Sequence, residues 1–323
     1  MLDNFGRTID YMRISLTDRC NMRCKYCMPH DIAAVSHEEV LRYEEFLKIC
    51  QAAIAVGINR FKITGGEPLV RKGALDFLAA LKKLPGVRSV TLTTNGYYLQ
   101  EALPRLQQIA VDGINISIDT LDPIAYTRLT GVDGCARVLA ALKASVERKL
   151  RTKLNVVLLK DNSEQILLLA KLAETMAVDV RFIELMPIGY GRNFQEITEE
   201  EALKLLRTRY PDLLPSREKL GNGPAVYYDS KYLQGKLGFI AANTHKFCQH
   251  CNRLRLTSMG FLKPCLCYED GVDLRAILRS ANQDVPTLLC QAIQTAIAAK
   301  PQGHCFNNQA KVTEEKNMNQ IGG

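Results

Sequence analysis

Three cysteines near the start of the chain are close enough in sequence to bind one metal centre. Cys20, Cys24 and Cys27 are spaced as C-x3-C-x2-C, so their thiolates can converge on a single loop. Iron–sulfur clusters of the ferredoxin type use four cysteines. A compact set of three therefore predicts a [4Fe–4S] cluster with one open iron, where a molecule that must be reduced or activated can coordinate.

A zinc site is the main alternative for this loop, because closed structural zinc sites also use cysteines two to four residues apart. Zinc would need a fourth ligand nearby, and His30 is the side chain that could supply it. The spacing by itself leaves both metals open.

A second set of three cysteines lies far downstream. Cys248, Cys251 and Cys265 are spaced as C-x2-C-x13-C. From spacing alone zinc is favoured here, because Cys267 or His250 could complete a tetrahedral site. Which thiol of the 265 and 267 pair coordinates stays open. The other cysteines stand alone and are predicted to pack as small apolar side chains or to lie at the surface; they are Cys50, Cys135, Cys290 and Cys305.

Composition and charge narrow the function classes. The 323 residues are 47% apolar, enough for one large core and a smaller appendage, and no run of 18 apolar residues could span a bilayer. The first ten residues lack the features of a secretory signal, so we expect no membrane association and a reducing, cytoplasmic location for the eleven cysteines. The net charge of +8 is dispersed and tryptophan is absent, which disfavours nucleic acid and suits a phosphate-rich small molecule.

The elements that must position the cysteines alternate along the first 187 residues. Short β-branched segments alternate with helical patterns, as in βα units wound around a parallel sheet. We predict strands near 11–16, 59–64, 89–94, 113–118, 153–159 and 179–185. We predict helices near 37–56, 73–84, 99–110, 135–149 and 163–176. Six such units predict an α/β fold, a partial TIM-like (β/α)6 barrel, whose chemistry lies at the carboxyl ends of the strands.

Residues 188–323 differ in pattern and predict a smaller α+β domain that carries the second cysteine set. A capping box from Thr198 to Glu201 starts a helix. Strand patterns follow at 226–228 and 236–240, and helical stretches lie near 272–280 and 285–299. The polar tail ends in Gly322 and Gly323, which are ordinarily a flexible end. We therefore predict two domains, 1–187 and 188–323.

Several motifs fall at the predicted strand ends. Gly65-Gly-Glu-Pro68 follows the second strand, where glycines allow a close backbone approach and Glu67 could receive an ammonium group, although a plain turn is the alternative. Thr93 and Ser117 end the third and fourth strands and could bind a ligand or cap the next helix. Met186 follows the sixth strand, where methionine is more often core than contact.

A polyphosphate needs several fixed cations, and guanidinium forks serve it well because they bind two oxygens at once. The candidates lie on or beside a predicted strand or cysteine set, with an exposed salt bridge as the alternative for each. They are Arg13, Lys62, Lys153, Arg253 and Arg255.

The segment from Tyr11 to Pro29 resembles the cluster loop of radical S-adenosylmethionine (SAM) enzymes. More narrowly, it resembles the GTP 3′,8-cyclase family of molybdenum cofactor biosynthesis. The block from Cys251 to Thr257 and the pair Pro264-Cys265 are similar to the second cluster site of that family. Together with Gly-Gly-Glu-Pro, the resemblance extends from Arg13 to the last residue.

This resemblance implies two [4Fe–4S] clusters, each with three cysteine ligands, with SAM on the first and the purine of GTP on the second. It implies SAM contacts at Tyr26, chiefly through its backbone, and at Gly66, Glu67, Ser117 and Met186. It implies GTP contacts at Arg13, Lys62, Thr93, Lys153, Arg253 and Arg255, with Lys62 standing where the family more often has arginine. Catalytic roles fall on Arg255, Gly322 and Gly323.

The implied reaction cleaves SAM to a 5′-deoxyadenosyl radical, which abstracts the 3′ hydrogen of GTP. The resulting carbon radical attacks C8 and gives 3′,8-cyclo-7,8-dihydro-GTP, the first step towards molybdopterin. Implied partners are a flavodoxin or ferredoxin as electron donor and cyclic pyranopterin monophosphate synthase as acceptor of the product. The chain would be a monomer or a homodimer. The alternatives are a two-cluster radical SAM enzyme that modifies a peptide, and a zinc-binding adaptor without catalysis.

Overall fold

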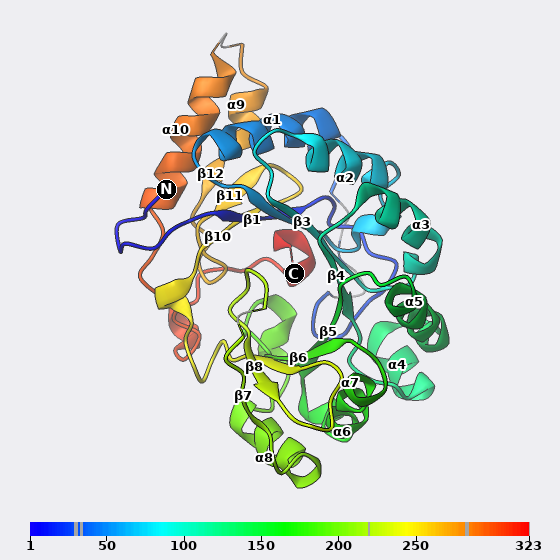
Figure 1. Ribbon diagram of the computed structural model, residues 1–323. Helices are drawn as coiled ribbons and strands as arrows, with labels where there is room; N and C mark the ends of the chain where they lie inside the picture. The colour runs from blue at the N-terminus through cyan, green and yellow to red at the C-terminus, as the bar shows by residue number, and fades with distance from the viewer. Residues whose placement is uncertain (29–31, 33–34, 219, 282–283, 323) are drawn as a thin grey trace.

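One continuous sheet organises the molecule (Figure 1). The computed structural model describes residues 1–28, 32, 35–218, 220–281 and 284–322. Within these residues, twelve strands form a single sheet in the order β12-β11-β10-β1-β2-β3-β4-β5-β6-β9-β8-β7. None of the helices in the described ranges is long and apolar enough to cross a membrane.

Six parallel strands in chain order form the centre of this sheet, as the sequence predicts. They are β1 (Tyr11–Ser15), β2 (Arg60–Thr64), β3 (Ser89–Thr94), β4 (Gly113–Ser117), β5 (Thr152–Leu158) and β6 (Asp179–Glu184). Alternate residues are apolar and fully buried, such as Ile14, Ile63 and Leu92. The prediction of a partial (β/α)6 barrel is confirmed, and the carboxyl ends of all six strands meet at one edge.

Helices cover the outer face of the curved sheet (Figure 1). They are α1 (Tyr43–Ala55), α2 (Ala74–Lys83), α3 (Leu99–Ile109), α4 (Pro123–Thr130), α5 (Cys135–Glu147), α6 (Gln165–Ala170) and α7 (Leu172–Thr175). Their buried faces, for example Phe46, Ile49 and Ala53 of α1, join the core that covers the sheet. Short 3-10 turns are η1 (Pro68–Val70), η2 (Lys160–Asn162), η3 (Gly189–Asn193), η4 (Cys248–His250) and η5 (Gln309–Lys311).

Three helix predictions needed correction. Helix α1 begins later than residue 37, because the main-chain N–H of Leu41 bonds to Ser258 O at 2.8 Å and fixes the preceding segment outside a helix. The stretch 163–176 is divided at Lys171 into α6 and α7. Helix α4 was missed, although Asp122 caps it and Pro123 occupies its first position, which are ordinary signals of a helix start.

The residues after 187 extend the same sheet at both of its edges. Strands β7 (Leu214–Pro215), β8 (Val226–Asp229) and β9 (Leu237–Ile240) continue from β6. Strands β10 (Arg253–Leu256), β11 (Phe261–Lys263) and β12 (Val272–Asp273) continue from β1. The helices of this part are α8 (Glu199–Arg209), α9 (Leu274–Leu278), α10 (Val285–Ala298) and α11 (Met318–Ile321). The second cysteine set therefore flanks β10, directly beside the first strand of the barrel.

The predicted capping box at the start of α8 is present. Thr198 Oγ1 accepts a hydrogen bond from the Glu201 main-chain N–H at 3.2 Å, and the Glu201 carboxylate accepts the Thr198 main-chain N–H at 2.8 Å. Two main-chain donors at the helix start are thus satisfied by local side chains, which fixes this boundary from sequence alone.

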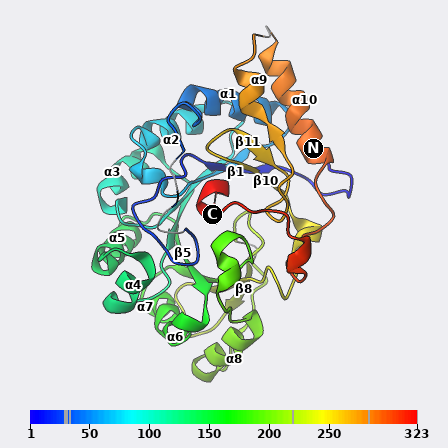
Figure 2. The same ribbon diagram turned by 180° about the vertical axis from the view of Figure 1, so that it is seen from behind.

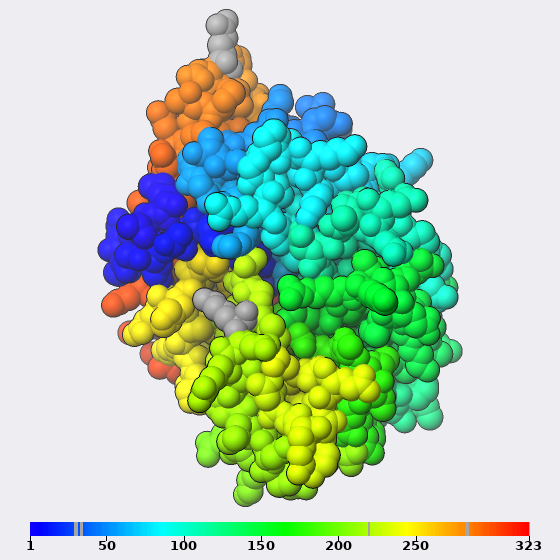
Figure 3. Space-filling model, in the orientation of Figure 1, coloured from blue at the N-terminus to red at the C-terminus, as the bar shows by residue number. Residues whose placement is uncertain are grey.

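The amino-terminal segment fastens the second cysteine region. The guanidinium of Arg7 is buried and donates to the carbonyl oxygens of Cys248, Gln302 and Pro301 at 2.9, 3.0 and 2.7 Å. Asp3 holds the same guanidinium at 2.6 Å. Figure 3 shows the blue amino-terminal residues against the yellow and orange segments of the later chain. Residues almost 300 positions apart thus share one buried polar contact.

After α10 the chain turns back and places α11 inside the curve of the sheet (Figures 1 and 2). A buried ion pair holds this tail, with Lys263 Nζ on β11 at 2.5 Å from Glu314 Oε2 and both side chains 2% exposed. Lys263 also donates to Tyr268 O at 2.6 Å. The charge of each partner is balanced only while the tail stays docked.

Glu314→Gln is expected to weaken this docking. The substitution leaves the Lys263 ammonium buried without its counter-charge, which costs on the order of 3 kcal/mol. Urea unfolding and limited proteolysis of the tail would measure the effect. Glu315→Gln, at the exposed neighbouring position, is the matched control. Equal behaviour of the two variants would show that the ion pair does not anchor the tail.

Candidate active site

A cavity of about 230 Å³ opens at the carboxyl ends of the barrel strands. It brings together residues that the sequence analysis selected separately, from the first cysteine loop, the strand ends and the downstream region. Among its lining residues are Arg13, Cys20, Cys24, Tyr26, Cys27, Gly66, Thr93, Ser117, Met186 and Arg255. Met318 and Asn319 of the tail helix line it as well.

The glycine pair after β2 positions the cysteine loop. A Cβ at Gly66 would lie 2.4 Å from Arg19 O and 2.6 Å from Asp18 O, so no other residue fits there. The main-chain N–H groups of Gly66 and Glu67 donate to Thr17 O and Arg19 O at 2.6 and 2.8 Å. The glycines therefore allow the cysteine loop to pack closely against their backbone. Gly66 still lines the cavity.

Glu67 is a buried carboxylate that accepts three hydrogen bonds. Its oxygens accept hydrogen bonds from the Leu69 main-chain N–H at 3.0 Å, Thr94 Oγ1 at 2.8 Å and the Asn95 main-chain N–H at 2.7 Å. The side chain is 1% exposed, and burial raises its pKa to about 7 despite these three donors. Glu67 thus ties the ends of β2 and β3 together beneath the cysteine loop.

The three thiols of the first set have surroundings that oppose their ionisation in the absence of a metal. Burial raises the pKa of Cys27 to about 12, against a main-chain N–H from Asn319 that lowers it. Burial also raises the pKa of Cys20 and Cys24. A donor set made only of thiolates suits an iron–sulfur cluster, whose iron supplies the positive charge.

No three His, Cys, Asp or Glu side chains in the described ranges are placed to hold a single metal ion. The zinc alternative for the first loop depended on His30, which lies outside the described residues. The residues that are described fit the cluster through their chemistry: three thiols on one loop, lining one cavity.

Tyr26 is held by a residue that the sequence analysis missed. Its hydroxyl donates to Asp119 Oδ2 at 2.7 Å, while Asp119 Oδ1 accepts the Val157 main-chain N–H at 2.8 Å. Burial raises the pKa of Asp119 to about 6. Asp119 comes two residues after the end of β4, where the sequence analysis selects only Ser117. The tyrosine ring between two cysteines is therefore locked against the next strands.

The strand register gathers the predicted cations. Arg13 on β1 pairs in register with Arg255 on β10 and with Lys62 on β2, so the three side chains project to the same face of the sheet. Burial and then nearby cations lower the pKa of Arg13 to about 10, and lower the pKa of Lys62 and Arg255 as well. Such buried repulsion is relieved by a bound anion.

Arg181 on β6 is a cation that the sequence analysis missed. Its guanidinium donates to Asn115 Oδ1 at 2.6 Å and Asn155 Oδ1 at 2.5 Å, and it is close enough to lower the pKa of Lys62. The alternation with the buried Val180 and Phe182 places it on the inner face. The sequence signal that could have identified Arg181 is a polar residue within a strand that is otherwise buried on both faces.

Lys153 and Lys62 are not among the lining residues of this cavity. Lys153 Nζ donates to Tyr227 Oη at 2.7 Å and pairs with Asp179 at 2.9 Å. Lys153 is thus ion-paired, but in a largely buried setting and not in the exposed salt bridge that was the alternative for the predicted cations. Its charge still contributes to the group, since it lowers the pKa of Lys62.

The second cysteine set lines a smaller cavity that adjoins the first. Cys248, Cys251 and Cys265 line it together with Arg253. Met186, Arg255 and Leu266 line both cavities, so the two cysteine sets lie in adjoining cavities. Burial alone would raise the pKa of Cys251, but Arg253 and Lys300 bring it down to about 6.

Lys300 and His304, which the sequence analysis did not select, also line this second cavity. Cys267 and His250, the side chains that could have completed a zinc site, are not among its lining residues. Of the thiol pair left open by the sequence, Cys265 is thus the one that faces the cavity.

The tail reaches the barrel interior through Gly322. The Arg255 guanidinium donates to Gly322 O at 2.7 Å, and Asn319 Nδ2 donates to Asp18 O at 3.0 Å. Gly322 has a φ of +81°, and a Cβ there would lie 3.2 Å from Ser15 Cβ. Its backbone conformation and its surroundings both favour glycine. Gly323 lies outside the described residues.

Known proteins match this chain over its whole length. The family model of the radical SAM superfamily matches residues 14–173, and that of Molybdenum Cofactor Synthesis C matches residues 178–306. A GTP 3′,8-cyclase of Clostridium perfringens is 38% identical over 325 residues, and one of Heliobacterium modesticaldum is 41% identical over 329 residues. Each alignment covers 100% of both chains. The chain belongs to the GTP 3′,8-cyclase family.

Members of the GTP 3′,8-cyclase family are radical SAM enzymes with two [4Fe–4S] clusters, and SAM and both clusters are accordingly the cofactors of this chain. A solved structure supports the fold. Streptococcus suis SuiB bound to S-adenosylmethionine aligns with a TM-score of 0.66 at 15% identity, covering 97% of this chain and 78% of that one. At this identity the likeness establishes only the shared architecture.

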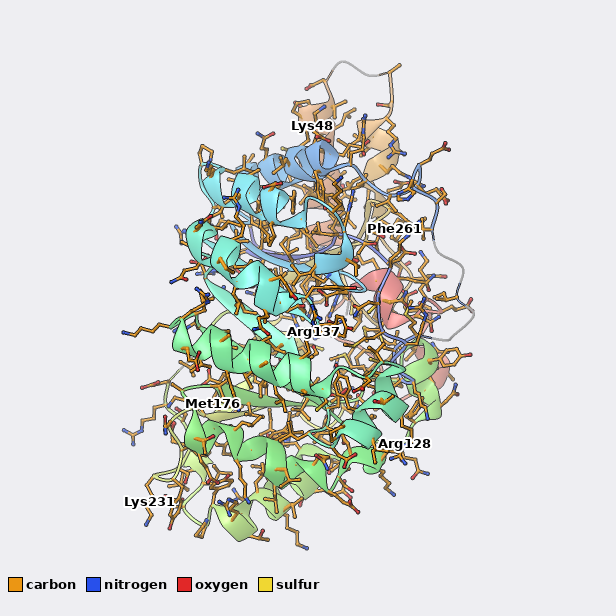
Figure 4. The ribbon with its side chains drawn as sticks, turned by 90° about the vertical axis from the view of Figure 1, so that its right-hand side faces the viewer. Lys48, Arg128, Arg137, Met176, Lys231 and Phe261 are labelled. Atoms are coloured by element: carbon orange, nitrogen blue, oxygen red, sulfur yellow. The ribbon has the colours of Figure 1, made fainter. Side chains whose placement is uncertain are left out.

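Lys62→Met is expected to weaken anion binding without destabilising the fold. Removing a buried cation relieves repulsion, so the melting temperature without an anion should stay equal or rise. Binding of inorganic tripolyphosphate should weaken about tenfold, the equivalent of about 1.4 kcal/mol. Lys48→Met is the control, because Lys48 is exposed on α1 on the outside of the fold (Figure 4). A weakening of the same size in both variants would contradict a specific role for Lys62.

The raised pKa of Glu67 predicts a pH-dependent stability of the cluster-free protein. Between its ordinary pKa of 4.5 and about 7, the folded state keeps a proton that the unfolded state releases. The contribution is fully present below pH 4.5 and is lost as the pH rises to about 7, by on the order of 3 kcal/mol. Urea midpoints across this range should show the slope in wild type and in Glu315→Gln. A slope that persists in Glu67→Gln would refute the assignment.

Proposed function

We propose that this chain is a GTP 3′,8-cyclase that converts GTP to 3′,8-cyclo-7,8-dihydro-GTP by way of a 5′-deoxyadenosyl radical, the first step of molybdenum cofactor biosynthesis. The observation that carries the proposal is that the two cysteine cavities adjoin and share lining residues. Arg255 lines both of them and lies in register beside Arg13, within a buried group of cations. Full-length similarity to proteins of that name supports the same reaction.

The first cysteine set and its neighbours would hold SAM. Cys20, Cys24 and Cys27 bind the cluster that, with SAM, supplies the one-electron cleavage giving the 5′-deoxyadenosyl radical. We assign the SAM contacts to Tyr26, Gly66, Ser117 and Met186, all of which line the cavity. Glu67 is assigned to the same site, where its bonds to three surrounding donors fix the strand ends against which SAM lies.

The second site would bind and orient GTP. Cys248, Cys251 and Cys265 would hold the second cluster, which would provide a binding position for the purine, and the cations would bind the triphosphate. We assign Arg13, Lys62, Lys153, Arg253 and Arg255 to this role, with Thr93 as a further contact. The buried cations favour a polyanion over a neutral peptide backbone, because fixed guanidinium groups need no reorganisation when they meet phosphate.

The remaining assignments complete the proposal. Arg255 and the Gly322 carbonyl that it binds form the inner end of the site, and Gly323 extends the same tail. A radical that abstracts unactivated hydrogen must be kept from water and from other C–H groups, and the docked tail closes the cavity in this way. The barrel would comprise residues 1–187 and the second-cluster region residues 188–323.

We also propose the cellular context that the family implies. The location is cytoplasmic, a flavodoxin or ferredoxin supplies electrons, and cyclic pyranopterin monophosphate synthase takes the product. The oligomeric state, monomer or homodimer, is left to measurement.

Incubation of the anaerobically reconstituted protein with SAM, dithionite and GTP tests the proposal. Mass spectrometry should show 5′-deoxyadenosine forming in step with an isomer of GTP. SAM cleavage at the same slow rate with and without GTP would keep the radical chemistry but reject the substrate, and would favour a peptide-modifying enzyme. Stoichiometric zinc without sulfide would favour the non-catalytic alternative.

Gly322→Ala tests the tail. The positive φ and the nearby Ser15 predict a strained tail, with a cost of about 1–3 kcal/mol confined to the last residues. The turnover number should fall at least tenfold, while SAM binding, measured by equilibrium dialysis, should change less than twofold. Gln309→Ala on the exposed part of the same tail is the control. Unchanged turnover in Gly322→Ala would remove Gly322 from the catalytic machinery.

A further inference from the structure

Two cysteines with no place in the proposed reaction lie in contact. The sulfur atoms of Cys267 and Cys305 are 3.2 Å apart, although 38 residues separate them in the chain. The main-chain N–H of Cys305 also points to Cys267 Sγ at 3.4 Å. The sequence analysis left Cys267 as a possible ligand and predicted that Cys305 packs as a small apolar side chain or lies at the surface. Cys305 does pack against the apolar cluster that contains Cys267, and the fold also brings the two sulfur atoms together because the tail returns across the loop after β11.

Neither thiol lines the cavity of the second cysteine set. Cys248, Cys251 and Cys265 line that cavity, whereas Cys267 lies in a small apolar cluster with Ile188, Phe306 and Val312. Both cysteines are free thiols. Their separation exceeds an S–S bond of about 2.05 Å by roughly 1 Å, which a small side-chain rotation can close. The geometry suits reaction with each other better than metal binding.

The two thiols differ in access. Cys267 is fully buried, while Cys305 is half-buried and bonds to Lys311 O at 3.0 Å, in a stretch where residues 307–311 are exposed. A small reagent can therefore reach Cys305 first, and Cys267 is already in place behind it. This order of access is that of an attacking thiol and a resolving thiol.

We propose that Cys267 and Cys305 form a reversible disulfide by exchange with a small-molecule disulfide. Cys305 Sγ attacks one sulfur of the reagent, forms a mixed disulfide and releases one thiol. Cys267 Sγ then attacks the Cys305 sulfur, forms the internal bond and releases the second thiol. The two protein thiols are oxidised, the reagent is reduced to two thiols, and each leaving thiol carries away one hydrogen.

The disulfide would join the loop that follows β11 to the tail, two segments that both contact the second cysteine set. Cys267 follows Cys265 by two residues, and the main-chain N–H of Glu314 bonds to Cys267 O at 3.3 Å. Cys305 follows His304, whose main-chain N–H points to Cys248 Sγ at 3.4 Å. A disulfide here would fasten the tail to the loop that bears the third cysteine of the second set. The inference does not depend on which nucleotide or peptide the enzyme uses.

The test uses anaerobically purified protein with both clusters intact, treated with oxidised glutathione and then with N-ethylmaleimide. Peptide mass spectrometry should show a cross-link between Cys267 and Cys305, lost on treatment with dithiothreitol. Iron content and absorbance near 400 nm should stay unchanged. Proteolytic release of the tail should slow at least threefold in the oxidised protein, a readout independent of activity.

Matched variants separate the steps. Cys267→Ser should accumulate glutathione on Cys305, Cys305→Ser should give neither product, and Cys290→Ser should behave as wild type. Cys290 is the control because it is also half-buried, and its thiol bonds to a carbonyl, Ala52 O at 3.7 Å, whereas the Cys305 sulfur contacts a second sulfur. A stable mixed disulfide on wild-type Cys305, or a cross-link that appears only after iron is lost, would overturn the proposal.

Discussion

Tyr11 to Ile14 of β1 pair in parallel register with Arg253 to Leu256 of β10, and this pairing fixes the relation between the two halves of the site. It sets Arg255 beside Arg13 and places the second cysteine set next to the strand that leads into the first. A register shift of one residue would turn the arginines away from the interior. The flanking apolar residues Met12, Ile14, Leu254 and Leu256 are fully buried and oppose such a shift.

The arrangement that follows is electrostatically unfavourable without an anion. Arg13, Lys62, Arg181 and Arg255 lie together in an interior that penalises charge. Burial lowers the pKa of Arg13, Lys62 and Arg255; Arg181 adds to this effect on Arg13 and Lys62, and Arg13 adds to it on Lys62 and Arg255. The folded chain compensates in part, since Asn115 and Asn155 accept from Arg181, and the Gly322 carbonyl accepts from Arg255. The folding free energy that this repulsion costs becomes available as binding energy when a phosphate-bearing ligand neutralises the charges.

The tail links this electrostatic arrangement to the rest of the fold. Its course is held by the Lys263–Glu314 pair, by Asn319 on Asp18 O and by the contact of Cys267 with Cys305. These contacts come from different segments, so the docked position of the tail depends on β10 and β11 as well as on the first cysteine loop. The position of the Gly322 carbonyl in the site therefore depends on tertiary contacts outside the tail.

Much of the barrel was predictable because its signals are local. Hydrophobic periodicity located the six central strands to within one residue at each end, and Thr198 with Glu201 fixed the start of α8. The helix 123–130 was not predicted, although Asp122 as N-cap and Pro123 at the first helical position are local signals of a helix start. The late start of α1 could not be predicted, because the carbonyl of Ser258 that restrains Leu41 lies more than 200 residues away.

By itself the sequence determined the thiols, the glycine pair and the cations, since these depend on residue type and short spacing. It could not determine which of them meet. The tertiary structure decided that Arg181 joins the cations, that Lys153 is paired with Asp179, that Glu67 faces inward and that Cys267 contacts Cys305. Each of these contacts joins side chains from separate segments, and their distance is set by strand register and loop closure, which local spacing does not encode.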